Sequence, residues 1–394
     1  MIKYKRQFSK LFWLSFTIFL LCFSANSQEI TLSDDAEISA ITVDPGKNLS
    51  DTFGHSAFRV KDKNIGIDQV YNYGMYNFDT PNFYSKFAQG KLPYYLASYP
   101  FPLFYRNYVN ENRGIREQVL NLNNTEKQQL YKFLLNNDKP ENRAYLYDFF
   151  YDNCSTKLID VCKTVLKDNV SFQNKFTKGK SETLRSLIHK YSAKNHPWGT
   201  FGIDLALGSV IDKKANTKDY LFLPDNVFKA FAESKHNNEP LVKETKTIFK
   251  AEKKDKKPII FTPWLVFSLI TLLIIAITII NIKNKNRLKL LDFLLFFITG
   301  LVGFLILFLW FATDHTATAK NYNILWAFAP NLIISFWMLK KELPNWVKKY
   351  SLLLLLLSFL MVVLWVLGVQ MFPMALIPVL LALSFRHWFL ANIN

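Results

Sequence analysis

Cys154 is the residue of this sequence that is best placed for nucleophilic chemistry. It directly follows Asp152 and Asn153, and apolar residues then recur at helical spacing along 158–166. Asp152 or Asn153 is therefore predicted to cap an amphipathic helix whose first turn contains Cys154. Unpaired N–H groups and the helix dipole lower the pKa of a thiol at this position, and the thiolate is the reactive form. The same position also suits a structural cysteine, so a partner base is needed to decide.

His55 is the strongest candidate for that base. The run Phe53-Gly54-His55-Ser56 places it at the start of a predicted strand, after a glycine that permits close backbone approach. Three other histidines precede residue 240 in basic or polar surroundings that are typical of a surface: His189, His196 and His236. A thiol paired with an imidazole is the arrangement of covalent acyl-transfer catalysis.

A β-hairpin is predicted to position His55. Residues 56–60 and 67–73 alternate apolar and polar types, and turn residues separate them. If positions whose numbers sum to about 127 face one another across the hairpin, His55 lies opposite Asn72 or its neighbour, and directly opposed side chains approach within ~5 Å. Asn72 is therefore predicted to orient the imidazole, as the third member of a Cys-His-Asn arrangement does.

The 394 residues divide into two units with different solvents, because the composition changes abruptly near residue 258. Residues 1–27 combine a basic start, an apolar stretch and an Ala-Asn-Ser cleavage motif, which is typical of a signal peptide. An uncleaved N-terminal anchor is the alternative, and both would export the chain from residue 28 onward. The exported domain is predicted at 28–240, a basic linker at 241–257 and a transmembrane domain at 258–394.

Only two cysteines remain once the signal peptide is removed, Cys154 and Cys162. Eight residues of one helix separate their Cα atoms by about 12 Å, which is too far for a disulfide. A free thiol kept in an oxidising compartment favours catalytic use, and a buried spectator thiol is the competing explanation. No metal or cofactor motif accompanies them, so none is expected.

Five apolar runs follow residue 258, each close to the ~20 residues needed to cross a bilayer. They are 259–282, 290–311, the shorter 323–339, 350–369 and 371–390. Lysine and arginine gather after the first and third runs and at the end of the fifth, which predicts an exported N-terminal domain and a cytoplasmic C-terminus. The net charge of +17 does not indicate nucleic acid, since export and membrane spans argue against that partner.

The loop from Asp314 to Asn323 is the most polar outward-facing part of the membrane half. An ordinary interfacial loop beside an aromatic belt would explain it. A second hypothesis is that His315 and Asn321 face lipid and help to seat a lipid headgroup near the thiol site.

Four stretches of the exported domain form a familiar combination: Phe53-Gly54-His55-Ser56-Ala57-Phe58-Arg59-Val60, Tyr71-Asn72-Tyr73-Gly74, Gly90-Lys91-Leu92-Pro93-Tyr94 and Asp152-Asn153-Cys154-Ser155-Thr156. Together they resemble the periplasmic N-terminal domain of Lnb-type lipoprotein N-acyltransferases. That family is similar to circularly permuted papain-like (NlpC-like) proteins, in which the histidine strand precedes the cysteine helix. The implied fold class is α+β for the exported domain, followed by an all-α transmembrane domain of about five helices.

The resemblance implies an acyl transfer on bacterial lipoproteins at the inner membrane. Cys154 would take an acyl chain from the sn-2 ester of the diacylglyceryl group and pass it to the N-terminal amine of the lipoprotein. His55 would move the protons, oriented by Asn72. Main-chain N–H groups at the start of the Cys154 helix would hold the oxyanion, with Asn153 and Ser155 as supporting residues. The implied partners are diacylated lipoproteins and the phospholipid bilayer.

Two other functions remain open. A cysteine peptidase or amidase acting on peptidoglycan would use Cys154 and His55 in the same way. An inactive envelope binding protein would keep the domain without its chemistry. The apolar runs favour a lipid substrate over the first, and the retained Cys, His and Asn argue against the second. The aromatic segment 94–105 either lines an acyl groove or packs in the core.

Overall fold

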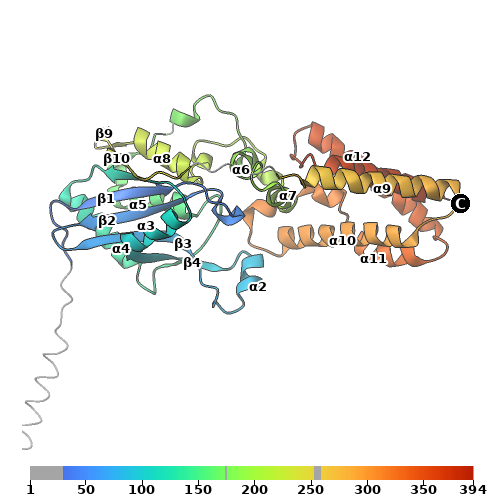
Figure 1. Cartoon of the computed structure of the whole chain (residues 1–394), viewed down its shortest axis with the longest axis horizontal. Helices are drawn as coiled ribbons and strands as arrows, with labels where there is room; N and C mark the ends of the chain where they lie inside the picture. The colour runs from blue at the N-terminus through green and yellow to red at the C-terminus, as the bar shows by residue number, and fades with distance from the viewer. Residues whose placement is uncertain (1–29, 174, 253–258, 394) are drawn as a thin grey trace, which may run out of the picture.

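The computed structural model describes residues 30–173, 175–252 and 259–393, so the predicted signal peptide lies outside the described residues. A sheet-containing domain and a helical bundle lie at opposite ends of an elongated molecule (Figure 1). The predicted fold class, an α+β domain followed by an all-α domain, is confirmed.

A seven-stranded antiparallel sheet forms the centre of the N-terminal domain. In spatial order its strands are β10 (Val242–Phe249), β5 (Ile115–Leu120), β1 (Glu37–Val43), β2 (His55–Asp62), β3 (Ile67–Met75), β4 (Pro93–Pro100) and β6 (Ala144–Leu146). A small second sheet contains β7 (Val170–Ser171), β8 (Lys235–His236) and β9 (Glu239–Pro240). Strands β1 and β2 are almost entirely buried, because both faces of the sheet are covered.

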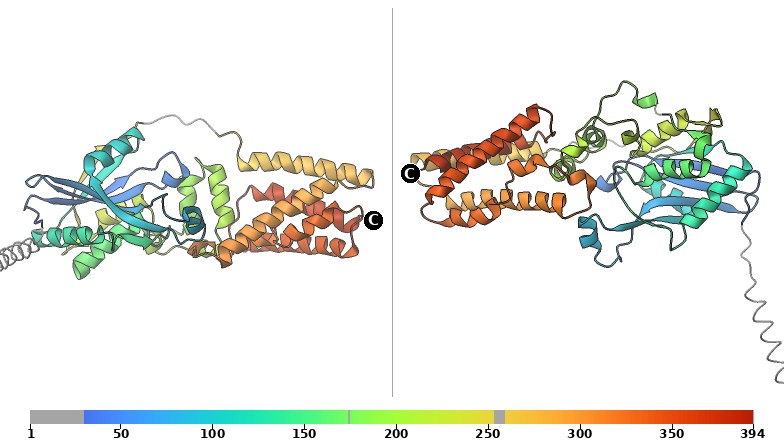
Figure 2. Two further views of the ribbon diagram at one scale, coloured as in Figure 1. Left: turned by 90° about the horizontal axis from the view of Figure 1, so that it is seen from below. Right: turned by 180° about the vertical axis from the view of Figure 1, so that it is seen from behind.

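Helices cover the two faces of the sheet, as the turned views show (Figure 2). One face shares a core with α4 (Asn124–Asn137), α5 (Cys154–Leu166) and α8 (Pro224–Glu233). The other face packs against α3 (Phe101–Asn110). Phe101 and Phe104 are buried in this second core, so this part of the aromatic segment 94–105 is core and does not line a groove.

Strands β2 and β3 form the predicted hairpin, but its predicted register is wrong by two residues. Phe58 pairs with Tyr71, and Asp62 with Ile67, so the turn lies at 63–66. The turn fixes the register of a hairpin. Asn72 is consequently diagonal to His55 across the hairpin, where a side chain still reaches its neighbour.

The predicted basic linker is wrong in its first part, because β10 is an edge strand of the main sheet. It pairs with β5, and Lys246 contacts Glu37 at 3.4 Å and Glu244 at 3.1 Å. Lysines are common on edge strands, where they discourage pairing with another chain. The many lysines of this stretch led to the prediction of a linker where the structure has a strand. The N-terminal domain therefore continues to at least Phe249.

The helical bundle contains four continuous helices: α9 (Pro263–Lys283), α10 (Lys289–Phe311), α12 (Asn345–Val366) and α13 (Leu376–Asn392). Among the described residues, α9, α10 and α12 are long and apolar enough to cross a membrane, whereas α13 has 17 residues. Their outward faces expose large apolar side chains such as Leu272, Phe304 and Phe359. Lipid tails, and not water, are the solvent that such faces require.

The predicted run 323–339 is not one continuous helix. It contains the 3₁₀ turns Tyr322–Leu325 and Ser335–Leu339 and the short α11 (Asn331–Ile334). Two glycines of α10 let this broken segment approach closely. A Cβ at Gly300 would lie 2.0 Å from the nitrogen of Leu332, and one at Gly303 would lie 2.0 Å from the oxygen of Ala327. Irregular backbone is tolerated in a membrane domain when protein surrounds it in this way.

A buried ion pair links three helices at one end of the bundle. Arg386 Nε donates to Asp292 Oδ1 at 2.6 Å, and both side chains are fully buried. Arg386 also donates to Asn281 Oδ1 at 2.9 Å, and Arg287 donates to Asp292 Oδ2 at 3.1 Å. A charge in so apolar a place is stable only when it is paired and hydrogen-bonded. Arg386, which the charge distribution assigned to the cytoplasmic side, is therefore also a structural residue.

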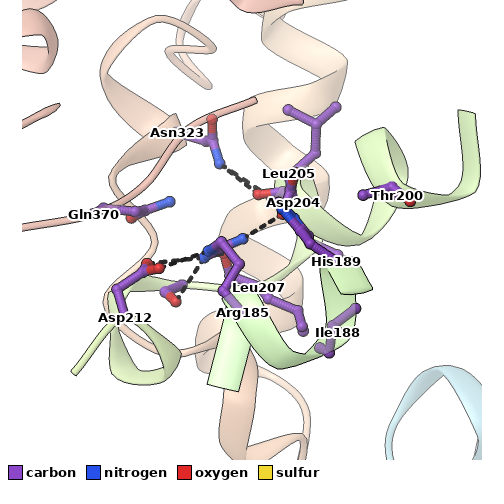
Figure 3. A network of polar contacts seen from close by, with 12 residues as sticks. Arg185, Ile188, His189, Thr200, Asp204, Leu205, Leu207, Asp212, Asn323 and Gln370 are labelled. Atoms are coloured by element: carbon purple, nitrogen blue, oxygen red, sulfur yellow. Dashed lines mark hydrogen bonds and ion pairs between the residues drawn. The ribbon is translucent and has the colours of Figure 1, made fainter. Parts of the chain in front are cut away.

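The two domains meet at a polar network centred on Arg185 of α6 (Leu184–Ser192), shown in Figure 3. Arg185 donates to Asp204 Oδ1 at 2.9 Å and to the two carboxylate oxygens of Asp212 at 2.8 and 3.0 Å. His189 contacts Asp204 Oδ1 at 2.9 Å. Asn323 of the bundle donates to the main-chain oxygen of Asp204, the eighth residue of α7 (Pro197–Ala206), at 3.2 Å.

Asn321 is buried in this junction, so the hypothesis that it faces lipid is wrong. Its amide donates to the main-chain oxygens of Leu205 at 2.7 Å and Ala206 at 3.2 Å, at the C-terminal end of α7. The last carbonyls of a helix lack partners within the helix, and the loop of the bundle supplies the donors. His315 is half-exposed beside Gly90, and its role toward lipid stays a prediction.

Replacing Arg185 with methionine is expected to destabilise the junction strongly. The substitution would leave Asp204 and Asp212 buried without their cation, which costs about 3–5 kcal/mol in comparable sites. The check is the chemical unfolding of the full chain in detergent. Lys190→Ala is the control on the same helix, because Lys190 is half-exposed and its pair with Glu182 should contribute at most about 1 kcal/mol. Equal losses for the two variants would contradict the prediction.

Candidate active site

Cys154 is the first residue of α5, and Asn153 is the residue that caps this helix. The side-chain oxygen of Asn153 accepts hydrogen bonds from the N–H groups of Ser155 at 2.8 Å and Thr156 at 3.0 Å. The side-chain nitrogen of Asn153 donates to the main-chain oxygens of Phe149 and Phe222, both at 2.8 Å. The predicted cap is thus confirmed with Asn153 as the capping residue. Its other bonds fix the helix start, and with it the thiol, against two surrounding loops.

His55 is brought to the thiol by the start of β2. Gly54 has a φ of +85°, and a Cβ there would lie 2.7 Å from the main-chain oxygen of Val43. Only glycine fits this combination of left-handed backbone and close approach. The strand then places Ser56, whose hydroxyl lies 3.2 Å from that of Ser155, against the first turn of α5. The contact sets the imidazole of His55 beside the Cys154 thiol.

The two side chains shift each other's pKa in the directions that favour an ion pair. Burial raises the pKa of Cys154, but the charge of His55 and its hydrogen bond outweigh burial, so the pKa of the thiol lies below its ordinary value. The N–H of Ser56 and the hydroxyl of Ser155 also stabilise the thiolate. Burial lowers the pKa of His55, and the neighbouring thiolate raises it above its ordinary value. Both shifts favour the thiolate–imidazolium form of the pair relative to the two isolated side chains.

Asn72 holds the far side of the imidazole. Its side-chain oxygen contacts Nε2 of His55, which leaves Nδ1 as the ring nitrogen that faces the thiol. The amide nitrogen of Asn72 donates to the hydroxyl of Tyr99 at 2.7 Å, and this fixes which end of the amide faces His55. The ring of Tyr108 stacks on the imidazole, with 6.3 Å between the ring centroids. The structure thus brings together the three residues predicted for a Cys-His-Asn arrangement.

Asn72→Ala is expected to lower the rate of thiol alkylation and of turnover by about 10-fold, because His55 would lose its orientation while the nucleophile stays. Asn72→Gln keeps the amide but moves it, and should recover little. The control is Tyr99→Phe, which removes only the hydroxyl behind Asn72 and should have a smaller effect. The measurement is the rate of Cys154 labelling as a function of pH. A variant with the rate and pH profile of the native chain would contradict this role for Asn72.

Two of the main-chain N–H groups predicted to hold the oxyanion already have partners in the structure. The N–H groups of Ser155 and Thr156 are occupied by the cap, and both nitrogen-bound hydrogens of Asn153 point to main-chain oxygens. Ser155 is fully buried, and its hydroxyl lies 4.0 Å from the sulfur of Cys154. Asn153 therefore shapes the helix start, and Ser155 stabilises the thiolate. The N–H of Cys154 itself is the donor of the first turn that remains available for a developing negative charge.

The thiol opens into a cavity of about 440 Å³. Besides Cys154, His55 and Asn153, its walls are mainly aromatic and include Tyr76, Phe83, Tyr94, Tyr147, Phe149 and Phe222. Such a lining excludes water and favours apolar ligands. The substrate group that reacts at Cys154 is therefore expected to carry a long apolar portion.

The other candidates lie elsewhere. His236 is buried and contacts Glu126 at 2.9 Å, so its predicted surface position is wrong. Cys162 is buried, and burial raises its pKa to about 12, which fits an unreactive thiol. Within the described ranges no cluster of ligand side chains could hold a metal ion. The contacts of Tyr99 with Asn72 and of Tyr108 with His55 were not predicted, since alternation within one segment does not reveal which distant residue a tyrosine meets.

A sheet domain with a thiol–imidazole–amide site, joined to helices that can cross a membrane, defines a membrane-bound thiol protein. Comparison with protein families then identifies the group. Residues 24–190 match the Lnb N-terminal periplasmic domain, and residues 254–393 match the Lnb transmembrane domain. The chain belongs to the Lnb-type lipoprotein N-acyltransferase family, and its N-terminal domain is periplasmic at the inner membrane. No curated protein and no solved structure matches the chain.

Proposed function

We propose that this protein moves an acyl chain from the sn-2 ester of a lipoprotein's diacylglyceryl group to the N-terminal amine of that lipoprotein. The thiolate of Cys154 attacks the ester carbonyl, and the N–H of Cys154 stabilises the negative oxygen. The bond between the carbonyl carbon and the ester oxygen breaks, and that oxygen stays on the glyceryl C2. The imidazolium of His55 gives its proton to the leaving alkoxide, and a thioester remains on Cys154.

The second half of the reaction returns the site to its first state. The amine of the lipoprotein attacks the thioester carbonyl, and an amide forms. Cys154 leaves as a thiolate, and His55 takes the proton that the amine loses. The products are an N-acyl lipoprotein with a free sn-2 hydroxyl and an unchanged enzyme. The proposed reaction therefore needs no cofactor.

The observation that carries the proposal is the position of the Cys154 thiol and the His55 imidazole, side by side, in an aromatic cavity of a membrane-bound Lnb protein. The histidine strand β2 precedes the cysteine helix α5, which fits a circularly permuted papain-like (NlpC-like) enzyme. The basic connections of the bundle support a cytoplasmic C-terminus. A domain held at the membrane surface meets lipid esters at high effective concentration.

The test uses the purified full chain and a synthetic diacylglyceryl lipopeptide whose sn-2 chain carries a heavy isotope. Transfer to the amine leaves the mass of the lipopeptide unchanged and moves the label into its N-terminal fragment ion. Loss of the labelled chain to water would instead indicate a hydrolase. A gain of an unlabelled chain would indicate a phospholipid donor. Either of these outcomes would overturn the proposed reaction.

A peptidoglycan peptidase or amidase is the rival function, because it would use the same thiol and imidazole. The aromatic cavity disfavours it, since cell-wall peptides and sugars are polar. Incubation of the full chain with purified muropeptides separates the two. Cleavage of muropeptides together with an unchanged lipopeptide would support the rival.

A further inference from the structure

A second cavity, of about 450 Å³, adjoins the one that contains the thiol. The two cavities share six lining residues: Ser50, Phe53, Phe87, Tyr94, Tyr147 and Phe149. Two aromatic pairs stand in the shared wall. Tyr94 stacks on Tyr147 with 4.4 Å between centroids, and Phe53 packs edge-on against Phe149 at 4.9 Å. The cavity that contains Cys154 therefore adjoins the second cavity at a wall that is mainly aromatic.

A loop of the helical bundle, together with α7 of the periplasmic domain, builds the far wall of this second cavity. The wall contains Ala206 of α7 and the loop Asp314–Thr318, which begins three residues after α10 ends at Phe311. Hydrogen bonds hold this loop against the periplasmic domain. The N–H of Asp314 donates to the oxygen of Gln89 at 2.8 Å, and Thr316 Oγ1 donates to Asp148 Oδ2 at 2.6 Å. The second cavity thus lies where a membrane-spanning helix emerges.

We propose that the two cavities form one channel that holds the fatty acyl chain being transferred, with its carbonyl at Cys154 and its tail toward the end of α10. This inference rests on the function proposed above and names the chain-binding site. A chain that leaves the bilayer for water loses favourable burial of every methylene group. A channel that is aromatic near the thiol and ends beside a membrane helix keeps most of the acyl chain in apolar surroundings. The polar groups of Asp314, His315 and Thr316 lie at the membrane end.

The test compares the full chain with Ala206→Trp, which fills the second cavity and leaves the walls of the first unchanged. The substrates are two diacylglyceryl lipopeptides with blocked amines, one with a butanoyl and one with a hexadecanoyl chain at sn-2. Thioester formation on the protein is followed by intact mass. Gly202→Trp is the matched control on α7, because it lies outside both cavities and no atom lies within 4 Å of its added Cβ.

Ala206→Trp is expected to slow the hexadecanoyl reaction by at least about 10-fold and to leave the butanoyl reaction within about twofold, since only the long chain needs the second cavity. The butanoyl rate also shows that the variant is folded. Equal effects on the butanoyl and hexadecanoyl reactions, or no effect on either, would overturn the channel. If the native protein forms no thioester with either substrate, the proposed function is overturned, and the channel with it.

Discussion

Cys154→Ser is expected to abolish turnover, by at least about 10³-fold, while the chain stays folded. The serine hydroxyl is almost never ionised at neutral pH, whereas the neighbouring imidazole lowers the pKa of the Cys154 thiol and so favours the thiolate. Serine also suits the first turn of a helix, so α5 and its Asn153 cap should persist. The measurement is acyl transfer to the lipopeptide amine, with intact mass to detect an acyl group on the protein.

Cys162→Ala is the matched control, because Cys162 lies on the same helix and is fully buried. Loss of its sulfur should cost about 1 kcal/mol of stability and leave turnover unchanged. In the native chain an alkylating reagent should modify Cys154 and spare Cys162. Retained activity in Cys154→Ser, or lost activity in Cys162→Ala with a folded chain, would remove Cys154 from the role of nucleophile.

His55→Ala is expected to lower turnover by about 10²–10⁴-fold and to raise the pKa of Cys154. Burial raises the thiol pKa, and His55 is the strongest of the groups that lower it. Without His55, burial is opposed only by the N–H of Ser56 and the hydroxyl of Ser155. The readout is the rate of Cys154 alkylation against pH, which tracks the thiolate fraction.

The pKa shifts of Cys154 and His55 set the direction in which alkylation and turnover depend on pH. The native thiol has a lowered pKa, so its alkylation should remain fast below the ordinary thiol pKa and fall only at more acidic pH. The raised pKa of His55 keeps the imidazole protonated up to a higher pH than in an ordinary histidine. The pH range in which turnover is expected therefore extends further at both its acidic and its basic limit. In His55→Ala the alkylation curve should move to higher pH. His189→Ala, at the domain junction and away from the thiol, should leave the curve in place. An unmoved curve in His55→Ala would contradict the pair.

The residues of the candidate site were identified from local patterns. The capped helix at Cys154, the strand at His55 and the hairpin built on that strand depend on neighbours within a few residues, and such signals are visible in one sequence. The apolar runs of the bundle are equally local, because a bilayer requires a long apolar segment whatever its neighbours are. Where a prediction needed an exact turn, as in the hairpin register, it was wrong by two residues.

The sequence by itself indicated the candidate thiol, imidazole and amide and showed which half meets lipid, since side-chain type and local periodicity express both. The tertiary structure decided the rest. It made the lysine-rich stretch after residue 241 an edge strand, buried Asn321 under α7 and placed Tyr99 behind Asn72. It also placed beside the thiol cavity a second cavity whose wall includes a loop of the bundle. Each of these depends on contacts between segments far apart in the chain, and the free energy of such contacts is fixed by packing that no local pattern encodes.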